Sequence, residues 1–154
     1  MNSRRFPSIL YGLFLAIAVG SLAVPSAIAA ESGGGRIQIV VVGLRSNSGR
    51  LVCTLFDSPD GFPRDDSAAR TMSVPIAAHS GTCNFPVTKR GQYAAVVFHD
   101  ENADGKFNSN WLGLPKEGYG FSNDASISWR PPNFEEAGFA FDGGSKRITV
   151  HIRY

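Results

Sequence analysis

The fold is decided by a stretch near the C-terminal end, RITVHIRY at residues 147–154. Apolar side chains occupy every second position of it, at Ile148, Val150 and Ile152, and polar or charged side chains stand between them. Successive side chains of a β-strand point to opposite faces of the sheet, so this alternation predicts a strand with one buried face. The same period of two runs through most of the chain.

Six further segments carry strand patterns. Two of them, 71–76 and 82–87, alternate in the same way, but Pro75 and Pro86 each remove a ladder hydrogen bond, which predicts edge strands. Another strand is expected at 138–141. Three more segments are apolar on both faces, which is typical of central strands. They span residues 37–44, 51–56 and 93–98.

The connections between these segments carry turn signals. The turn SNSG at residues 46–49 predicts a hairpin between the first two strands. The only segment with a helical pattern is short, at residues 65–70. Seven short strands separated by turns predict an all-β fold, either an antiparallel β-sandwich or a small barrel. We expect the first, a single antiparallel β-sandwich of about seven strands.

One connection is unusually long. Residues 100–136 show neither a strand pattern nor a helix pattern, and connections of that length in a compact domain are uncommon unless they are functional. The segment is rich in aromatic residues, which argues against disorder. We therefore expect a long ordered loop here.

The N-terminal 29 residues have the layout of a secretory signal peptide. Arg4 and Arg5 precede an apolar run, and AIA at residues 27–29 supplies a small-residue cleavage site. The alternative is a retained membrane anchor, but the apolar run is short for a span of about 20 residues. We expect a periplasmic or secreted protein with a flexible segment at 30–35, one domain at 36–154 and no membrane span after cleavage.

Removal of the signal peptide changes the charge. The whole chain carries a formal net charge of +2, and loss of Arg4 and Arg5 leaves 13 basic and 13 acidic residues. A neutral domain with interspersed charges lacks the basic surface that nucleic acids require. No nucleic-acid partner is expected.

Two cysteines, Cys53 and Cys83, are the only ones in the chain. Export delivers them to an oxidising compartment, where disulfides persist. Cys53 shares a strand face with Leu51 and Leu55, and Cys83 shares one with Phe85, so both thiols are expected in one core. The alternative is two separate buried thiols, and the shared core favours a disulfide.

The long connection opens with a calcium-loop pattern, DENADGKFN at residues 100–108. Carboxylate and amide oxygens occupy its first, third and fifth positions, and Gly105 occupies the sixth, where the chain turns sharply. The expected ligands are Asp100, Asn102, Asp104, the carbonyl of Lys106, Asn108 and Glu117.

The calcium pattern has one fault. Its twelfth position, which needs a bidentate acid, is Trp111, so Glu117, Asp124 or water must take that place. The alternative is a metal-free turn in which carboxylates accept hydrogen bonds from backbone N–H groups. Calcium is the only cofactor expected.

Several side chains around this loop are candidates for ligand binding. His99 is either a buried, hydrogen-bonded residue at a strand end or a metal ligand or general base. The aromatic residues either present a platform to a carbohydrate or peptide or form a local core. The candidates are His99, Trp111, Tyr119, Phe121 and Trp129.

Five segments occur in the order found in one known family. They are GQYA at 91–94, FHDEN at 98–102, DGK at 104–106, GLPKEGYGFSN at 113–123 and PPNF at 131–134. With these segments the chain, over residues 36–154, resembles an uncharacterised family of small exported bacterial proteins, domain of unknown function 2141. The resemblance implies a sandwich of the immunoglobulin or transthyretin type, similar to carboxypeptidase-regulatory modules, and implies no activity. Many members carry Asp at the position of Asn108, which implies weaker calcium binding here.

The function expected first is an exported non-catalytic binding or structural module. Its partner would be a carbohydrate, a peptide or an envelope protein. No catalytic residue is assigned, and the chain has no Gly-x-Ser-x-Gly elbow. The alternative is a periplasmic hydrolase with a site around His99, Asp100 and Glu117, and a third possibility is a structural envelope protein that acts through partner contacts.

Overall fold

Eight strands form two sheets in the part of the chain that the computed structural model describes, residues 34–67, 69–110 and 115–154. A 3-10 turn, η1 (Ser122–Asp124), and a single-turn helix, α1 (Phe134–Ala137), lie between the sixth and seventh strands. In chain order the strands are β1 (Gly35–Val42), β2 (Arg50–Phe56), β3 (Arg70–Val74), β4 (Ser80–Val87), β5 (Gly91–Asp100), β6 (Gly118–Phe121), β7 (Phe139–Phe141) and β8 (Ser145–His151).

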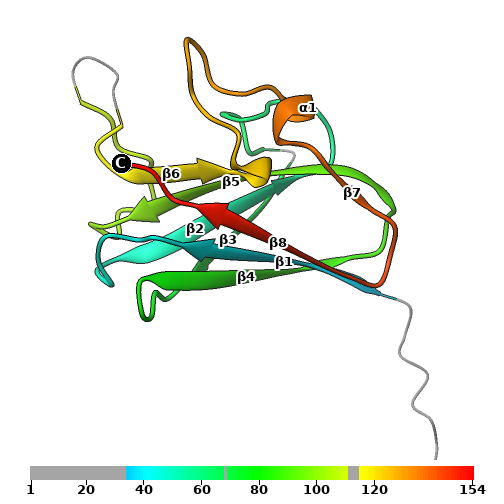
Figure 1. Cartoon of the computed structure of the whole chain (residues 1–154), viewed down its shortest axis with the longest axis horizontal. Helices are drawn as coiled ribbons and strands as arrows, with labels where there is room; N and C mark the ends of the chain where they lie inside the picture. The colour runs from blue at the N-terminus through cyan, green and yellow to red at the C-terminus, as the bar shows by residue number, and fades with distance from the viewer. Residues whose placement is uncertain (1–33, 68, 111–114) are drawn as a thin grey trace, which may run out of the picture. The chain divides into compact units, whose positions relative to one another are not determined.

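The two sheets pack face to face as a sandwich (Figure 1). One has the order β4-β1-β8, and the other has the order β3-β2-β5-β6, with β7 paired to the start of β5. The predicted all-β sandwich is confirmed. The pairing of β1 with β8 is parallel, whereas the other described strand pairs are antiparallel. These two strands can run parallel because nearly the whole domain lies between them as a crossover.

The positions of the strands follow their composition. β4, which contains Pro86, and β3, which ends just before Pro75, both lie at sheet edges, as predicted. The strands that are apolar on both faces, β1, β2 and β5, are flanked by strands on both sides. The missing N–H of proline therefore accounts for the edge positions of β3 and β4, and the apolar character of both faces accounts for the central positions of β1, β2 and β5.

Two local predictions are wrong. β1 and β2 do not form a hairpin, because β1 lies between β4 and β8 while β2 lies between β3 and β5. The turn at 46–49 instead carries the chain from one sheet to the other. Turn residues predict where a chain reverses but not which sheet the next strand joins. The helix expected at 65–70 is also not formed, since its described residues lie in turns and at the start of β3.

The main core lies between the two sheets and includes a disulfide. Cys53 on β2 and Cys83 on β4 are bonded, with Cα atoms 6.4 Å apart, and both are fully buried. The predicted disulfide is confirmed, and it joins one sheet to the other. The core residues around it are mostly β-branched or aromatic: Ile37, Ile39, Val41, Leu51, Leu55, Phe85, Val87, Tyr93, Val97, Phe141 and Val150.

The long connection is ordered by a strand that the sequence pattern did not reveal. β6 pairs with the end of β5 and contains two glycines, which are depleted in strands. A Cβ atom on Gly120 would lie 2.7 Å from Val150, and one on Gly118 would lie 2.5 Å from the ring of Tyr154. These glycines allow β6 to approach the C-terminal segment closely, where Tyr119 and Arg153 exchange backbone hydrogen bonds of 2.8 Å.

The described residues contain no helix that is long and apolar enough to cross a membrane. The predicted signal peptide, residues 1–29, lies outside the described residues.

The disulfide should stabilise the sandwich substantially. Replacement of Cys53 and Cys83 by Ala opens a loop with a sequence separation of 30 residues. The expected loss in free energy of unfolding is about 3–4 kcal/mol, because the unfolded chain regains loop entropy. Urea denaturation measures this, with the reduced wild-type protein as the control. Equal midpoints for the oxidised protein and the double variant would contradict the prediction.

Candidate ligand-binding groove

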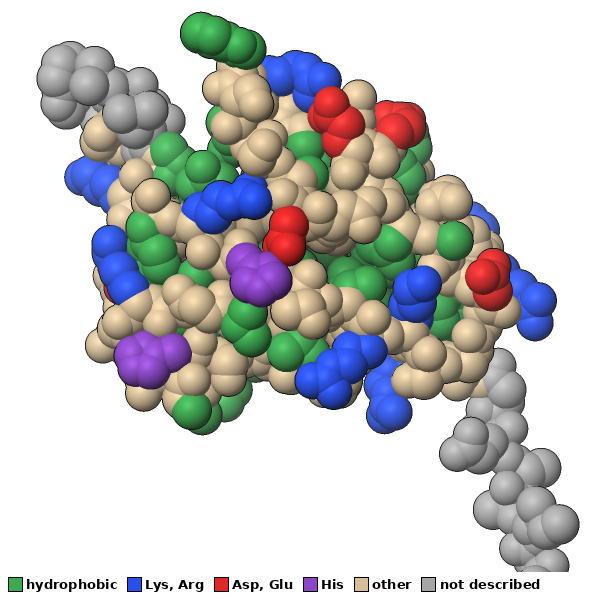
Figure 2. Space-filling view, viewed as in Figure 1, with side chains coloured by type: hydrophobic (Ala, Val, Ile, Leu, Met, Phe, Trp, Pro, Cys, Tyr) green, Lys and Arg blue, Asp and Glu red, His purple; other side chains and the backbone are tan. Residues whose placement is uncertain are grey.

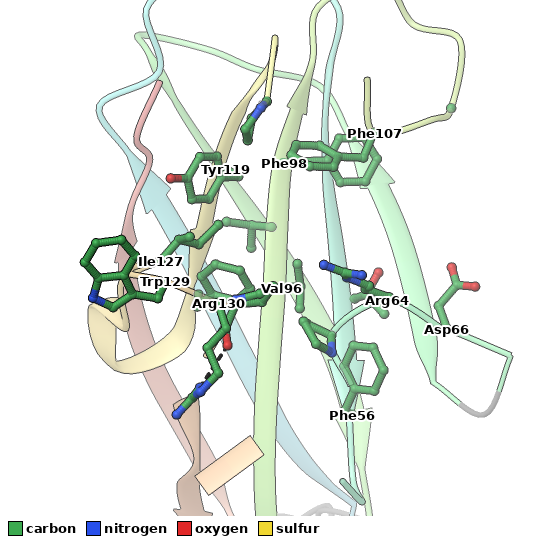
Figure 3. A pocket seen from close by; sticks show the side chains of 17 residues that line it. Phe56, Arg64, Asp66, Val96, Phe98, Phe107, Tyr119, Ile127, Trp129 and Arg130 are labelled. Atoms are coloured by element: carbon green, nitrogen blue, oxygen red, sulfur yellow. Dashed lines mark hydrogen bonds between the residues drawn. The ribbon is translucent and has the colours of Figure 1, made fainter. Parts of the chain in front are cut away.

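The outer face of the five-stranded sheet, turned away from the main core, carries an apolar groove of about 570 Å³ (Figure 3). Its floor consists of strand side chains that alternate with those of the core. Val96 on β5 lies opposite Thr54 on β2 and Phe121 on β6. Phe98 lies opposite Tyr119 in the same way. The floor is therefore a regular sheet surface, held by ladder hydrogen bonds.

Connecting segments form the walls of the groove. Arg64 and Asp66 lie to one side of Val96, whereas Trp129 and Arg130 lie to the other (Figure 3). Phe107 closes the groove near Phe98, and their ring centroids are 5.7 Å apart. Because loops on a rigid sheet commonly carry binding residues, this arrangement is typical of a ligand site.

A second small hydrophobic cluster fixes one wall. Phe62 packs edge-on against Phe56, with ring centroids 5.1 Å apart, and against Phe134 of α1 at 5.9 Å. The buried members of this cluster are Phe56, Ala94, Phe121, Phe134 and Ala137. The segment that carries Arg64 is thus anchored on the outer face of the sheet.

The opposite wall is held by charge and by a helix cap. Arg130 donates hydrogen bonds to both carboxylate oxygens of Glu136, at 2.8 and 2.9 Å. These bonds, together with the backbone N–H of Asn133, lower the pKa of Glu136 to about 2. Asn133 and Glu136 also form a reciprocal capping box at the start of α1. The hydrogen bonds of Arg130 to Glu136 therefore attach the segment that carries Trp129 to the start of α1.

Exposed apolar side chains gather around this groove. Trp129 is fully exposed, and Phe107 and Ile127 are 47% and 37% exposed. These are three of the four large exposed apolar residues in the described parts of the chain, and all three line the groove. Apolar groups grouped in one exposed patch usually mark an interaction site.

The charges on the surface are interspersed. Lys and Arg side chains are spread over the face seen in Figure 2, and the fewer Asp and Glu side chains lie in its upper and right-hand parts.

The predicted calcium loop is a hydrogen-bonded turn. Asp100 is buried, and its carboxylate accepts hydrogen bonds from the backbone N–H groups of Asp104 and Gly105, at 3.1 and 2.8 Å. The carboxylate of Asp104 accepts from the side chain of Asn108 and from the backbone of Lys106. The hydrogen bond from Asn108 contributes most to a lowered pKa of Asp104.

All six predicted ligand residues belong to this one hydrogen-bond network. Asn102 joins it through Asp104, at 2.9 Å. Glu117, from far along the connection, is buried and accepts a hydrogen bond of 2.9 Å from the N–H of Asn108. Asp124, the other acid considered for the incomplete position, instead accepts from the ring of His151 at 2.7 Å. Calcium binding stays a prediction.

His99 is fully buried and both of its ring nitrogens are engaged. Nε2 lies 2.8 Å from the carbonyl oxygen of Ser48, which only accepts, so Nε2 carries a proton. Nδ1 lies 2.6 Å from the hydroxyl of Tyr154, which also accepts a hydrogen bond from the backbone N–H of Arg45. The structure thus has the buried, hydrogen-bonded histidine that the sequence left as one alternative.

The hydrolase interpretation gains no support from this geometry. His99, Asp100 and Glu117 are buried, make hydrogen bonds to neighbouring groups, and do not line the groove. A general base needs access to the substrate proton.

The predicted ligand-binding residues divide into three groups. Tyr119, Phe121 and Trp129 line the groove, whereas His99 does not, and Trp111 lies outside the described residues. Several lining residues were not predicted from the sequence, although β5 carried one signal for them because it is apolar on both faces. They include Arg64, Val96, Phe98, Phe107 and Ile127.

These features define a β-sandwich domain with an aromatic groove on the outer face of one sheet. The chain belongs to the family described as "Uncharacterized protein conserved in bacteria (DUF2141)", whose family model matches residues 39–149. The resemblance stated from sequence motifs is confirmed, and the match includes the whole groove and both cysteines. Searches of the curated proteins and of the solved structures each found no match.

The network around His99 should stabilise the fold. Tyr154→Phe removes a hydroxyl that is hydrogen-bonded to two groups, Nδ1 of the buried His99 and the backbone N–H of the exposed Arg45. The expected loss is about 1–3 kcal/mol in free energy of unfolding, measured by urea denaturation. Tyr119→Phe is the matched control, because no hydrogen bond of its hydroxyl is seen among the described residues. A similar loss in both variants would contradict the role given to Tyr154.

Proposed function

We propose that this protein is an exported, non-catalytic binding module whose ligand lies in the groove on the outer face of the five-stranded sheet. The observation that carries the proposal is the grouping of Phe107, Ile127 and Trp129 around one groove. Aromatic rings have few torsions to immobilise and bury a large area, so rings on segments that border a rigid sheet suit the apolar faces of a ligand.

Export is part of this proposal. The bond between Cys53 and Cys83 is of the kind that persists in oxidising compartments. The signal-peptide layout of residues 1–29 provides a route to such a compartment. The protein would therefore act in the periplasm or outside the cell.

Binding rather than catalysis is favoured by the composition of the groove. Its described lining contains one carboxylate, Asp66, and neither histidine nor cysteine. Catalysis by an acid and a base, or by an activated nucleophile, needs at least two such groups in mutual reach. The acids and the histidine of the hydrolase alternative are buried elsewhere, as described above.

The groove can be tested by removing its exposed rings. Phe107→Ala together with Trp129→Ala should weaken ligand binding at least tenfold, since central aromatic residues carry most of the energy of such sites. The probes are soluble hexasaccharides of chitin, cellulose and xylan, and random octapeptides displayed on phage. Binding to the immobilised protein is measured by biolayer interferometry and by phage recovery.

The matched control truncates two apolar side chains on the outer face of the other sheet, Val40→Ala with Val42→Ala. This double variant should bind as the wild type does, once its melting temperature shows that it is folded. A wild-type protein that binds none of the probes, or a groove variant that binds them unchanged, would overturn the proposed function.

We also propose that the loop from Asp100 to Asn108 is a weak calcium site. The placement of Glu117 beside Asn108 supports this, because it brings a carboxylate to a loop whose twelfth position lacks one. The oxygen-rich network of Asp100, Asn102 and Asp104 supplies further ligands of the type that calcium prefers.

Calcium at 10 mM should raise the melting temperature. For a dissociation constant of about 1 mM, typical of extracellular modules, the stabilisation is about 1.4 kcal/mol, or a few degrees. Asp104→Asn should abolish the shift, whereas Asp142→Asn, on an exposed turn, should retain it. Magnesium at the same concentration is the ionic control. An unchanged melting temperature and no calcium in the purified protein would contradict the site.

A further inference from the structure

The groove offers a ligand few hydrogen bonds. Two of its polar side chains are already occupied, since the hydroxyl of Thr54 lies 3.0 Å from that of Thr71, and Arg130 binds Glu136. Asp66 accepts one long hydrogen bond of 3.4 Å from Thr71. The lining side chains that can make hydrogen bonds are Thr54, Arg64, Asp66, Tyr119, Trp129 through its indole N–H, and Arg130.

Arg64 differs from the other cation of the groove because its guanidinium has no carboxylate partner among the described residues. Its backbone is fixed, since its N–H donates to the carbonyl of Gly61 at 2.8 Å and Phe62, two residues before it, packs against the second hydrophobic cluster. An exposed guanidinium at a fixed backbone position beside apolar rings is suited to a carboxylate, which it can bind through two parallel hydrogen bonds.

The chemistry of the groove disfavours a carbohydrate. A sugar carries hydroxyl groups around its edge, and each one that is buried without a partner weakens binding. Besides Arg64, the groove provides the hydroxyl of Tyr119, the indole N–H of Trp129 and the partly engaged carboxylate of Asp66. That is too few partners for the hydroxyl groups of several sugar rings.

An extended peptide makes different demands. Its apolar side chains need only surface to pack against, which Phe98, Phe107 and Trp129 provide. Its backbone N–H and C=O groups also need partners, and because the groove is open to solvent, those on its open side keep water as their partner. One acidic side chain of the peptide, or its C-terminal carboxylate, can pair with the guanidinium of Arg64, which has no carboxylate partner among the described residues. Asp66 on the same wall would repel a second acid nearby, so the groove suits one carboxylate rather than an acidic run.

We infer that the groove binds an extended peptide segment that carries aromatic or apolar side chains and one carboxylate, which pairs with Arg64. This inference rests on the proposed function of the groove as a binding site. It makes Trp129 and Phe107 the source of affinity and Arg64 the source of selectivity for charge.

The experiment selects random octapeptides on phage against the oxidised mature protein and measures the selected peptides by fluorescence anisotropy. Enriched peptides should contain an aromatic residue and one acid. Arg64→Glu should weaken their binding about tenfold. Analogues in which lysine replaces the acid should bind Arg64→Glu more tightly than they bind the wild type.

Arg147→Glu, which makes the same charge change on the outer face of the other sheet, is the matched control and should alter binding less than twofold. Enriched peptides without an acid, or peptides indifferent to Arg64→Glu, would overturn the inference. Binding of the hexasaccharides without enrichment of any peptide would overturn it and leave the binding function standing. If neither class binds, the inference and the proposed function both fail.

Discussion

Strand β5 has to bury both of its faces, because Ala95 and Val97 on one face and Val96 and Phe98 on the other are all apolar. The three-stranded sheet covers the first face and completes the main core. Only loops and a single-turn helix are available for the second face, and they cover it in part. The uncovered remainder is the groove. The main core and the candidate groove thus both arise because the apolar side chains on the two faces of β5 must be covered.

The segment after β5 is shaped by the need to come close to other parts of the chain. Gly118 and Gly120 leave space for the C-terminal residues, and Tyr154 in turn reaches the buried His99 at the end of β5. This small polar network connects the two sheets, because Tyr154 follows β8 and His99 lies at the end of β5. Both ring nitrogens of His99 have hydrogen-bond partners in it, so the histidine can be buried without an unpaired polar group.

Much of the sandwich was predictable, and much of the groove was not. The edge position of β4 was predictable because Pro86 removes a backbone donor, and the central position of β5 was predictable because both of its faces are apolar. The disulfide between Cys53 and Cys83 was predictable because side-chain alternation within each strand placed both thiols in the core. The turn at residues 46–49, which joins two sheets instead of forming a hairpin, and the glycine-rich β6 depend on pairing between segments distant in the sequence, which periodicity does not encode. Arg64 and Phe107 lie in loops without any period, so only tertiary packing brings them to one surface.

The parallel pairing of β1 with β8 has a consequence for how the chain reaches its folded state. Strand β1 depends on β8 for one of its two neighbours, and β8 is the last of the described strands along the chain. Pairings between segments so distant in sequence form slowly, because a long loop must close first. The three-stranded sheet is therefore completed only after residues 145–151 are free to pair with β1, so a partly synthesised chain exposes one edge of β1.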